Sequence, residues 1–519
     1  MQFRAAVGTG PFRAFEGWAG KAVCAVALSL ALASAAQAQF GFGLGAGQAD
    51  AGEDVAVDSN GNTTLIGSFR QTVDFDPGAG TANLTAVGNE NFVASYGPTG
   101  NFRYAFALGG SNAVVPERGI AVDGFDNIYV TGWFSGIVDF DPGAGTATLD
   151  SSSGNLFVAS YTSAGAFRYA FNLDSGVNGE QGSDIAVDPA GNSYVTGFFS
   201  GTIDFDPGAG SSPATSAGVN DIFVASYDTL GGLRFGIGVG GTLADEGLGI
   251  AVDTAGNSYV TGSFTGSADF EPGAGVTTLN AVGARDAFLA SYTDAGALRY
   301  ALSLGDSTTD IGNGVAVDAS GNALVTGQFE GSVDFDPGAG TTTVTSAGGG
   351  DAFVASYTTA GALRFAFPLG DIAVDRGFDA AVDGAGNFYV TGEFNNAVDF
   401  NPAGGTAILN PSGAAQAYVA SYTNTGAYRV AYSTSGVSTA TARGIGLALD
   451  ASGRSHVIGT FQGTIDVDVT AGTENISSVA DDIFFTNFVL LPLVPSLGPW
   501  AAALLVVLLG ASGALRLRR

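Results

Sequence analysis

One aspartate recurs at a nearly constant interval along this 519-residue chain, five times after 65 residues and once after 67. It closes an apolar segment of the type Ile-Ala-Val-Asp, and the second copy continues with Tyr-Val-Thr-Gly-Trp-Phe, Phe-Val-Ala-Ser-Tyr and Phe-Arg-Tyr-Ala-Phe. A fixed period of this kind indicates a repeat fold, in which each unit buries its apolar face only against its neighbours. The seven positions are Asp58, Asp123, Asp188, Asp253, Asp318, Asp383 and Asp450.

The four apolar segments of a copy, which we call A to D in chain order, predict four short β-strands. Their residues alternate or are β-branched and aromatic, Gly, Asn, Asp and Pro separate them, and none has a helical period. Four antiparallel strands repeated seven times are typical of an all-β, seven-bladed β-propeller. We therefore expect residues 39–490 to form one monomeric propeller.

The seventh copy is incomplete, and the mature N-terminus supplies what it lacks. It contains A (445–450), B (456–461) and C (483–488), but no D segment follows. Residues 40–44, Phe-Gly-Phe-Gly-Leu, precede the first A segment as residues 102–108 precede the second. We predict that residues 40–44 pair with residues 483–488 and close the last blade, which removes an open sheet edge. The alternative is an open solenoid with a frayed start.

Residues 1–38 have the three parts of a secretory signal peptide. A basic stretch with Arg4, Arg13 and Lys21 precedes an apolar run over residues 22–33, and Ala-Gln-Ala at 36–38 is a small-residue cleavage site. The apolar run is shorter than the roughly 20 residues of a spanning helix, so an uncleaved anchor is the second interpretation. We expect export across the inner membrane and a mature chain that begins at Gln39.

Residues 491–519 are predicted to be a C-terminal sorting or transmembrane segment. Its motif consists of Val494, Pro495, Ser496, Leu497 and Trp500, and an apolar stretch over residues 501–515 and a basic terminus follow. The segment resembles the IPTL-CTERM class of bacterial sorting tails, from which it departs at the first and third motif positions. The resemblance implies processing by a dedicated membrane enzyme, with at least transient insertion of the helix. Independently, the basic terminus should stay cytoplasmic. A simple membrane anchor is the alternative.

The body between these two ends is strongly acidic and contains no Cys, Lys or Met. Of the 18 basic residues, six lie in the ends, which leaves 12 arginines against 47 of the 48 acids, a balance of −35. Disulfides and zinc-thiolate sites are therefore excluded for the body. Nucleic acid and anionic lipid should be repelled, because their binding requires basic side chains that neutralise phosphates. Cations or neutral ligands are the expected partners.

The repeat is similar to the SBBP-type repeat of bacterial β-propellers, and the resemblance extends over residues 39–490. It is carried by segments of the types Ile-Ala-Val-Asp, Tyr-Val-Thr-Gly and Asp-Phe-Asp-Pro-Gly, which recur with substitutions along the copies. The resemblance implies the fold and no single activity.

Three recurring residues favour structural roles. The Asp that closes A precedes sequences such as Ser-Asn-Gly-Asn and should begin a hairpin turn. The Gly inside B indicates a bulge or a close approach of backbones. The Arg in D is expected to pair with a neighbouring carboxylate. These arginines are Arg103, Arg168, Arg234, Arg299, Arg364 and Arg429.

The Asp-x-Asp-Pro-Gly loop between B and C is the candidate cation site. Side chains at i and i+2 of an extended chain point the same way, and calcium prefers six to eight oxygen ligands. Asp before Pro-Gly is also an ordinary turn starter, so turn chemistry and calcium both remain open. The pairs are Asp74 and Asp76, Asp139 and Asp141, Asp204 and Asp206, Asp269 and Glu271, Asp334 and Asp336, Asp399 and Asn401, and Asp466 and Asp468.

The sequence favours recognition over catalysis. A catalytic site should break the sevenfold symmetry, and the body does so with a single His456 and a single Trp133, for which we expect structural roles. The leading interpretation is a non-enzymatic, surface-directed propeller that recognises an extracellular glycan, matrix polymer or protein. The face that carries the B–C and D–A loops would bind it. The alternatives are an extracellular polysaccharide hydrolase or lyase, and a calcium-binding structural surface protein.

Overall fold

A computed structural model of the chain describes residues 39–109, 117–177, 179–338, 340–402, 404–469 and 472–489. The predicted signal peptide and the predicted sorting tail with its motif lie outside the described residues. In the described ranges there is no helix that is long and apolar enough to cross a membrane.

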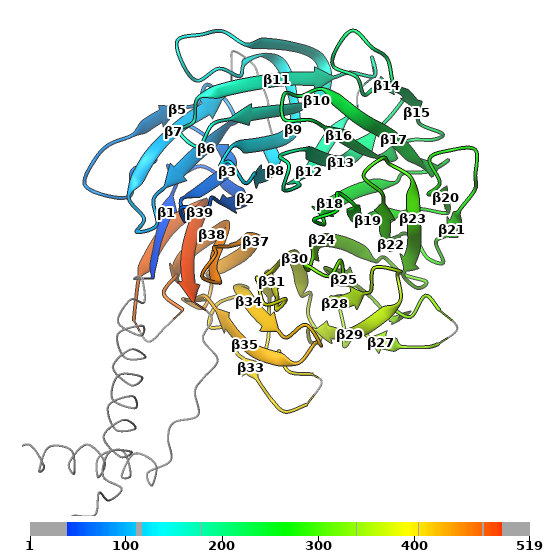
Figure 1. Ribbon diagram of the computed structural model, residues 1–519. Helices are drawn as coiled ribbons and strands as arrows, with labels where there is room; N and C mark the ends of the chain where they lie inside the picture. The colour runs from blue at the N-terminus through cyan, green and yellow to red at the C-terminus, as the bar shows by residue number, and fades with distance from the viewer. Residues whose placement is uncertain are drawn as a thin grey trace, which may run out of the picture. The chain divides into compact units, whose positions relative to one another are not determined.

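Seven antiparallel sheets, blades 1 to 7, follow one another around a ring (Figure 1). From strand A to strand D they are β2 (Ala51–Val57), β3 (Thr63–Phe69), β6 (Glu90–Tyr96), β7 (Phe102–Leu108); β8 (Glu117–Val122), β9 (Ile128–Asp139), β10 (Thr148–Tyr161), β11 (Phe167–Leu173); β12 (Gln181–Val187), β13 (Ser193–Phe199), β16 (Asp221–Tyr227), β17 (Leu233–Gly241); β18 (Glu246–Val252), β19 (Ser258–Phe264), β22 (Asp286–Tyr292), β23 (Leu298–Leu304); β24 (Ile311–Val317), β25 (Ala323–Phe329), β28 (Asp351–Tyr357), β29 (Leu363–Leu369); β30 (Arg376–Val382), β31 (Phe388–Phe394), β34 (Gln416–Tyr422), β35 (Tyr428–Ser433); and β37 (Thr441–Leu449), β38 (Arg454–Asp466), β39 (Asn475–Val489), β1 (Phe40–Leu44). The prediction of seven four-stranded blades is confirmed.

The segment between strands B and C, which the sequence suggested to be a loop, folds into a small hairpin in every blade. In blades 2 and 7 the hairpin continues the long strands β9 and β10 and β38 and β39. In the others it is a separate pair: β4 (Thr72–Asp74) and β5 (Asn83–Thr85), β14 (Thr202–Asp204) and β15 (Pro213–Thr215), β20 (Ser267–Asp269) and β21 (Thr278–Asn280), β26 (Ser332–Asp334) and β27 (Thr343–Thr345), and β32 (Val398–Asp399) and β33 (Ile408–Leu409). A two-residue strand β36 (Ser435–Gly436) pairs with β38.

The middle residue of the Asp-x-Asp motif fastens each hairpin to its blade, and it is a Phe in blades 1 to 6 and Val467 in blade 7. In blade 1 Phe75, the middle residue of Asp-Phe-Asp, is fully buried, and its ring lies edge-on to Phe69 at 5.5 Å and 4.8 Å from Phe92. The hydroxyl of Tyr96 donates to the Phe75 carbonyl at 2.9 Å. Aromatic pairs of this geometry contribute about 0.5–1.5 kcal/mol beyond the area that they bury. The Asp-Phe-Asp segment is therefore first of all a packing element.

The ring is closed, because each innermost strand contacts the innermost strands of both neighbouring blades, from β2 through β8, β12, β18, β24 and β30 to β37 and back to β2. This arrangement excludes the open solenoid. Closure of blade 7 is made by β1, which pairs antiparallel with β39 from Phe40 opposite Asn487 to Leu44 opposite Ile483. The predicted pairing of the two ends of the propeller is confirmed.

The B–C and D–A loops, which were predicted to lie on the same face of the ring, do lie together. The segment that precedes strand C in blade 3 touches the D–A loop, since the Asp245 amide donates to the Asn220 carbonyl at 2.9 Å and Asn220 forms a parallel bridge with Ala244. Equivalent bridges occur in blades 4 and 6.

Replacement of Phe42 tests the closure. Its ring packs against Tyr96 at 4.8 Å and Phe485 at 5.3 Å, so it joins β1 to blades 1 and 7. We expect Phe42→Ala to lower the free energy of unfolding by about 3–5 kcal/mol, the usual cost of removing a buried Phe, measured by denaturant unfolding.

The matched control is Phe125→Ala, because Phe125 is 73% exposed, and a surface change of this kind should stay within about 0.5 kcal/mol. Equal effects of the two substitutions would contradict the closing role of β1.

Candidate functional site

The predicted Asp-x-Asp pairs act as turn residues. In blade 1 the Asp74 Oδ1 accepts from the amides of Asp76 at 3.1 Å and Ala82 at 2.8 Å, and the Asp76 Oδ1 accepts from the Gly78 amide at 2.8 Å. The first Asp makes its two bonds in all seven blades. In blade 3 the amides of Ser212 and Asp206 hold the pKa of Asp204 below its usual range. The turn interpretation is confirmed.

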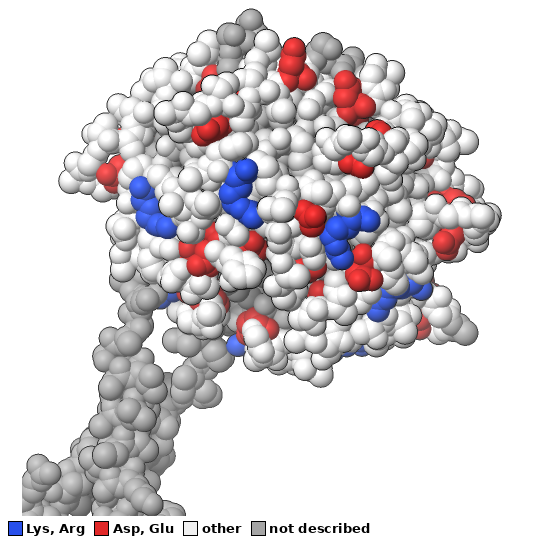
Figure 2. Space-filling model, turned by 45° about the horizontal axis from the view of Figure 1, so that its top comes forward, with Lys and Arg blue, Asp and Glu red and all other residues white. Residues whose placement is uncertain are grey.

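The structure does not bring these pairs together. Each belongs to the hairpin of its own blade at the outside of the ring (Figure 1), and acidic side chains are scattered over the face in Figure 2. Among the described residues, no three Asp, Glu, His or Cys side chains are placed to hold a metal ion. Calcium binding by these hairpins stays a prediction.

The recurring Asp of strand A also begins a turn, as predicted. The Asp58 Oδ1 accepts from the amides of Asn60 and Asn62 at 2.9 and 2.8 Å, and Gly61 has a φ of +76°. In blade 2 the positive φ falls on Asp126 instead, at +64°. The Gly of strand B faces a bulge, since a Cβ at Gly67 would overlap the Ala51 carbonyl oxygen. Both interpretations are confirmed.

The prediction that the strand D arginines pair with carboxylates is wrong for most of them. Arg103 donates to the Ser95 hydroxyl at 2.6 Å and to the Ser163 carbonyl of the next blade at 2.9 Å. The serine contact recurs in blades 1 to 6. Among the described ion pairs, only Arg429 has a carboxylate within reach, Asp383 at 3.9 Å. The guanidinium also stacks on an aromatic ring of strand B of the same blade in blades 2, 3, 4 and 6, and Arg364 of blade 5 stacks on Phe388 of blade 6. These contacts hold the arginines in place without a carboxylate.

His456 has the structural role that was expected. It is 1% exposed, burial lowers its pKa, and its Nδ1 lies 2.9 Å from the Thr63 hydroxyl of blade 1. The closing strand β1 contains no arginine, and its Gly41 takes by register the place of Ala105 in β7. Arg454, the first residue of β38, places its guanidinium 3.3 Å from the Asn487 Oδ1. Trp133, for which blade packing was expected, lies half-buried in β9 opposite Leu156.

A set of residues that sequence reasoning missed meets at the centre of the ring. The fourth residue before the recurring Asp is Asp in three copies and Gly in four: Asp54, Gly119, Asp184, Gly249, Gly314, Asp379 and Gly446. An alignment of the copies on that Asp would have revealed this alternation. The innermost strands bring the three aspartates to one central cavity of about 190 Å³.

Each of these aspartates joins its own blade to the next one. The Asp54 Oδ1 accepts from the Val55 amide at 2.7 Å, and its Oδ2 accepts from the Ile120 amide of blade 2 at 2.9 Å. Asp184 binds the amides of Ile185 and Ile250 in the same way, and Asp379 binds those of Ala380 and Leu447.

The glycines of the set are required by close packing between blades. A Cβ on Gly119 or Gly314 would lie 2.7 Å from the Cα of the Asp in the next blade, and one on Gly446 would lie 2.8 Å from the Asp54 Cα. Real Cβ atoms do not approach so closely, so Asp and Gly alternate around the ring. Because the number of blades is odd, Asp and Gly cannot alternate around the whole ring. Two glycines are neighbours at one junction, Gly249 of blade 4 and Gly314 of blade 5.

The environment of the cavity opposes ionisation of the three aspartates. Burial raises the pKa of Asp184 to about 8 and that of Asp379 to about 7. Burial and the charges of Asp379 and Asp184 raise the pKa of Asp54 well above its usual range. Near neutral pH the cavity therefore holds partly protonated carboxyls, which can both donate and accept hydrogen bonds.

The residue that precedes each member of this set differs from blade to blade. The fifth position before the recurring Asp is occupied by Glu53, Arg118, Ser183, Leu248, Asn313, Phe378 and Ile445. All of these except Arg118, whose side chain is outside the described part, line the cavity together with Gln181. This position breaks the sevenfold symmetry at the centre of the ring.

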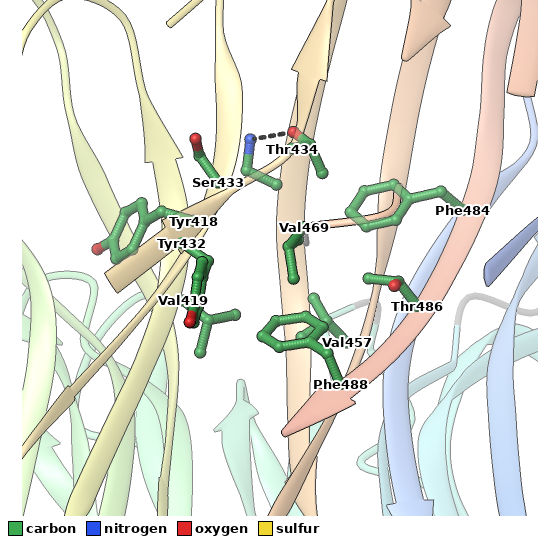
Figure 3. A pocket seen from close by; sticks show the side chains of 11 residues that line it. Tyr418, Val419, Tyr432, Ser433, Thr434, Val457, Val469, Phe484, Thr486 and Phe488 are labelled. Atoms are coloured by element: carbon green, nitrogen blue, oxygen red, sulfur yellow. Dashed lines mark hydrogen bonds between the residues drawn. The ribbon is translucent and has the colours of Figure 1, made fainter. Parts of the chain in front are cut away.

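A second pocket, between blades 6 and 7, is too small for a ligand. Tyr432, Val457, Phe484 and Phe488 are among the residues that line it (Figure 3), and its volume is about 10 Å³. A cavity needs roughly 10–15 Å³ to hold a single water molecule. The central cavity is the better candidate.

Comparisons with known proteins agree with the fold. The family model of the SBBP β-propeller repeat matches residues 237–271. Over 439 residues the chain is 24% identical to an uncharacterized WD repeat-containing protein of Acanthamoeba polyphaga mimivirus; the match covers 71% of this chain and 31% of the relative, so the chain spans about a third of that protein. The chain is thus a β-propeller repeat protein, and the part of it that matches the SBBP repeat is residues 237–271.

Two solved structures are similar at a low level. The pyranose dehydrogenase PQQ domain of Coprinopsis cinerea has a TM-score of 0.35 and 14% identity, with coverage of 87% of this chain and 97% of that chain. A gluconolactonase of Xanthomonas campestris has a TM-score of 0.27 and 10% identity, with coverage of 70% and 89%. At these scores the similarity carries no argument about function.

Buried carboxyls also occur in the D–A loops, away from the cavity. The Asp245 carboxyl accepts from the amides of Thr265 and Gly241, and burial raises its pKa to about 6. Burial likewise raises the pKa of Asp50 and Asp375 to about 6, and that of Glu180 and Asp310 to about 7.

The raised pKa values of these carboxyls predict that the stability of the protein increases as the pH falls from about 8 to about 5. Their pKa values exceed those of an unfolded chain, about 3.9 for Asp and 4.3 for Glu, so the folded state binds more protons throughout this window. The free energy of unfolding then falls as the pH rises. Denaturant unfolding at several pH values in this range measures the slope.

Acidification also reduces repulsion among the surface charges, so the series should be repeated at about 1 M salt, where the Debye length is about 3 Å. Proton binding by buried groups persists under that condition. Stability that increases with pH at high salt would contradict the prediction.

The calcium prediction is tested by thermal melting with about millimolar calcium against a chelator. If the hairpins bind calcium, the melting temperature should rise with calcium, because a ligand that binds only the folded state stabilises it. Asp74→Asn, which keeps an acceptor oxygen but removes a charge, should reduce that rise. An unchanged melting temperature would remove calcium from consideration.

Proposed function

We propose that the protein is an exported, surface-directed β-propeller that binds a ligand in its central cavity without transforming it. The observation that carries this proposal is a central cavity whose lining differs from blade to blade. The position of Glu53, Ser183 and Phe378 has a different residue in every blade, and it lines the cavity in the six blades whose side chain at this position is described. A single ligand in contact with several blades would need such an asymmetric lining.

Export is supported by the sequence of the two ends. Residues 1–38 have the organisation of a cleaved signal peptide, and residues 491–519 that of a sorting tail. The acidic body, which should repel nucleic acid and anionic lipid, fits an extracellular ligand such as a glycan or a protein.

Binding without turnover is supported by the bonding of the aspartates. Each of their carboxyls is tied to its own blade and to the next by backbone amides, which gives it a role in the scaffold. A raised pKa in a cavity with other carboxyls is also what a glycosidase acid requires, so a polysaccharide hydrolase or lyase is the second candidate. Release of new reducing ends from polysaccharides would favour it.

A substitution that fills the cavity tests the proposal. We expect at least one class in a small-molecule panel of neutral sugars, amines, carboxylic acids and nucleosides to raise the melting temperature of the protein. Leu248 is half-buried at the cavity wall. The substitution Leu248→Trp should abolish the rise in melting temperature, because the indole ring occupies the space of the ligand.

Leu243→Trp is the matched control. Leu243 is 45% exposed in the D–A loop of the same blade junction, so this variant should keep the response. A response that survives Leu248→Trp would place binding elsewhere, and the absence of any response would overturn the proposal.

A further inference from the structure

We infer that the face of the ring formed by the B–C and D–A loops is an interface with a second copy of this chain, with the two copies face to face. The inference goes beyond the proposed function and concerns a surface outside the central cavity. It is carried by exposed aliphatic side chains at the blade junctions and by arginines that gather on the same face. Such a dimer would replace the monomer that the sequence led us to expect.

Exposed aliphatic side chains occur at every junction between two blades on this face. Where the segment between strands B and C of one blade meets the D–A loop to the next, eight large apolar side chains are between 45% and 85% exposed. From the junction of blades 7 and 1 onward they are Val479, Val87, Val177, Val219 with Leu243, Val282, Ile372 and Val437. We call this set the apolar ring. In the described A–B and C–D turns of the opposite face only Phe125 and Leu230 are comparable.

The apolar ring is built from repeated positions. Val87, Val282 and Val479 are each the twenty-ninth residue after the recurring Asp of their copies. Val177 and Ile372 each precede the next recurring Asp by 11 residues. Because equivalent residues of a propeller lie at similar distances from its axis, a copy placed face to face brings apolar side chains opposite apolar side chains in any rotational setting. The apolar ring is therefore complementary to itself.

The arginines outside strand D gather on this face as well. In the body, the six strand D arginines are bound within the blades, Arg454 is buried, and the side chain of Arg118 lies outside the described part. The remaining four lie at the strand ends next to the B–C and D–A loops: Arg70 after β3, Arg285 before β22, Arg376 at the start of β30 and Arg443 in β37. A chain with a net charge of −30 thus places these four cations around the apolar ring.

The charges around the apolar ring fit a second copy. Asp174 and Asp481 are exposed at the same strand ends as the arginines, so both signs of charge are present and two copies can pair them across the contact. Exposed apolar side chains rimmed by polar residues mark interaction surfaces, and arginine is enriched in protein interfaces. An anionic membrane is disfavoured because the exposed acids repel it. A contact between two identical faces is the isologous interface that most dimers use.

The described chain enters and leaves the propeller on the opposite face. β1 begins at Phe40, which pairs with Asn487 close to the end of β39. In blade 7 these strands take the places of D and C, and strand C ends where strand D begins, at the C–D turns. Residues 40 and 489 therefore lie away from the B–C and D–A loops, and contact between two such faces does not involve either of them.

Sedimentation velocity of the purified full chain at increasing protein concentration tests the inference. We expect concentration-dependent dimers, and more of them at about 1 M salt, where a Debye length of about 3 Å screens the repulsion between two acidic copies. Burial of apolar surface persists under that condition. A monomer at every concentration and at both low and high salt would overturn the inference.

A charged apolar ring should not associate. The double substitution Val479→Asp with Ile372→Asp should weaken the dimer at least about 100-fold, because it brings like charges together in the contact. The matched control is Leu230→Asp with Phe125→Asp, which makes the same change of charge on the opposite face at similar exposure and should leave the dimer intact. Both pairs replace exposed side chains, so the melting temperatures should change little. Dimers that survive the first pair, as association through residues 491–519 would, overturn the inference.

Mixing two variants tests whether the two faces meet. Val479→Arg with Ile372→Arg should also be monomeric alone, but an equimolar mixture with the Asp variant should recover the dimer, because opposite charges then meet across the contact. In a head-to-tail arrangement each altered face would meet an unaltered surface, and the mixture would not recover. Absence of recovery would overturn the face-to-face contact. None of the substituted residues lines the central cavity, so the result is independent of the test with Leu248→Trp.

Discussion

The pairing of β1 with β39 is the interaction on which the rest of the structure depends. Five residue pairs join the beginning of the propeller to its end, and the innermost strands β2 and β37 are in contact at the same junction. The closing strand β1 contains no arginine. Arg454 and Asn487 provide in that blade the kind of polar contact that Arg103 and Ser95 provide in blade 1.

Closure also creates the centre of the molecule. Once the innermost strands form a ring, one residue from each blade must approach its neighbours closely, and the alternation of Asp and Gly solves this packing problem. Asp54 uses both carboxyl oxygens to connect two blades, while Gly446 gives the Asp54 backbone the room it needs. The burial that this arrangement requires raises the pKa of the aspartates, so the scaffold and the chemistry of the cavity have one cause.

The sequence was a good guide to the fold because the same local signals occur seven times. Turn residues such as Asp58 and Gly61 act through neighbours two to four residues away, and those contacts can be read from a single copy. The strand D arginines were misjudged because Ser163, the carbonyl partner of Arg103, belongs to the next blade. The hairpins between strands B and C were taken for loops because their anchor, Phe75, packs on Phe69 and Phe92 from two other strands.

By itself, the sequence determined the number of blades, the order of their strands and the segment that closes the ring, because period and alternation are local properties of the chain. Only the tertiary structure decided which of the 48 acidic residues line the central cavity. Asp54, Asp184 and Asp379 are far apart in sequence and meet because ring closure directs one position of every blade to the same cavity. The burial of these aspartates, their pKa values and the volume of the cavity depend on neighbours from several blades. The sequence of a single copy therefore does not reveal them.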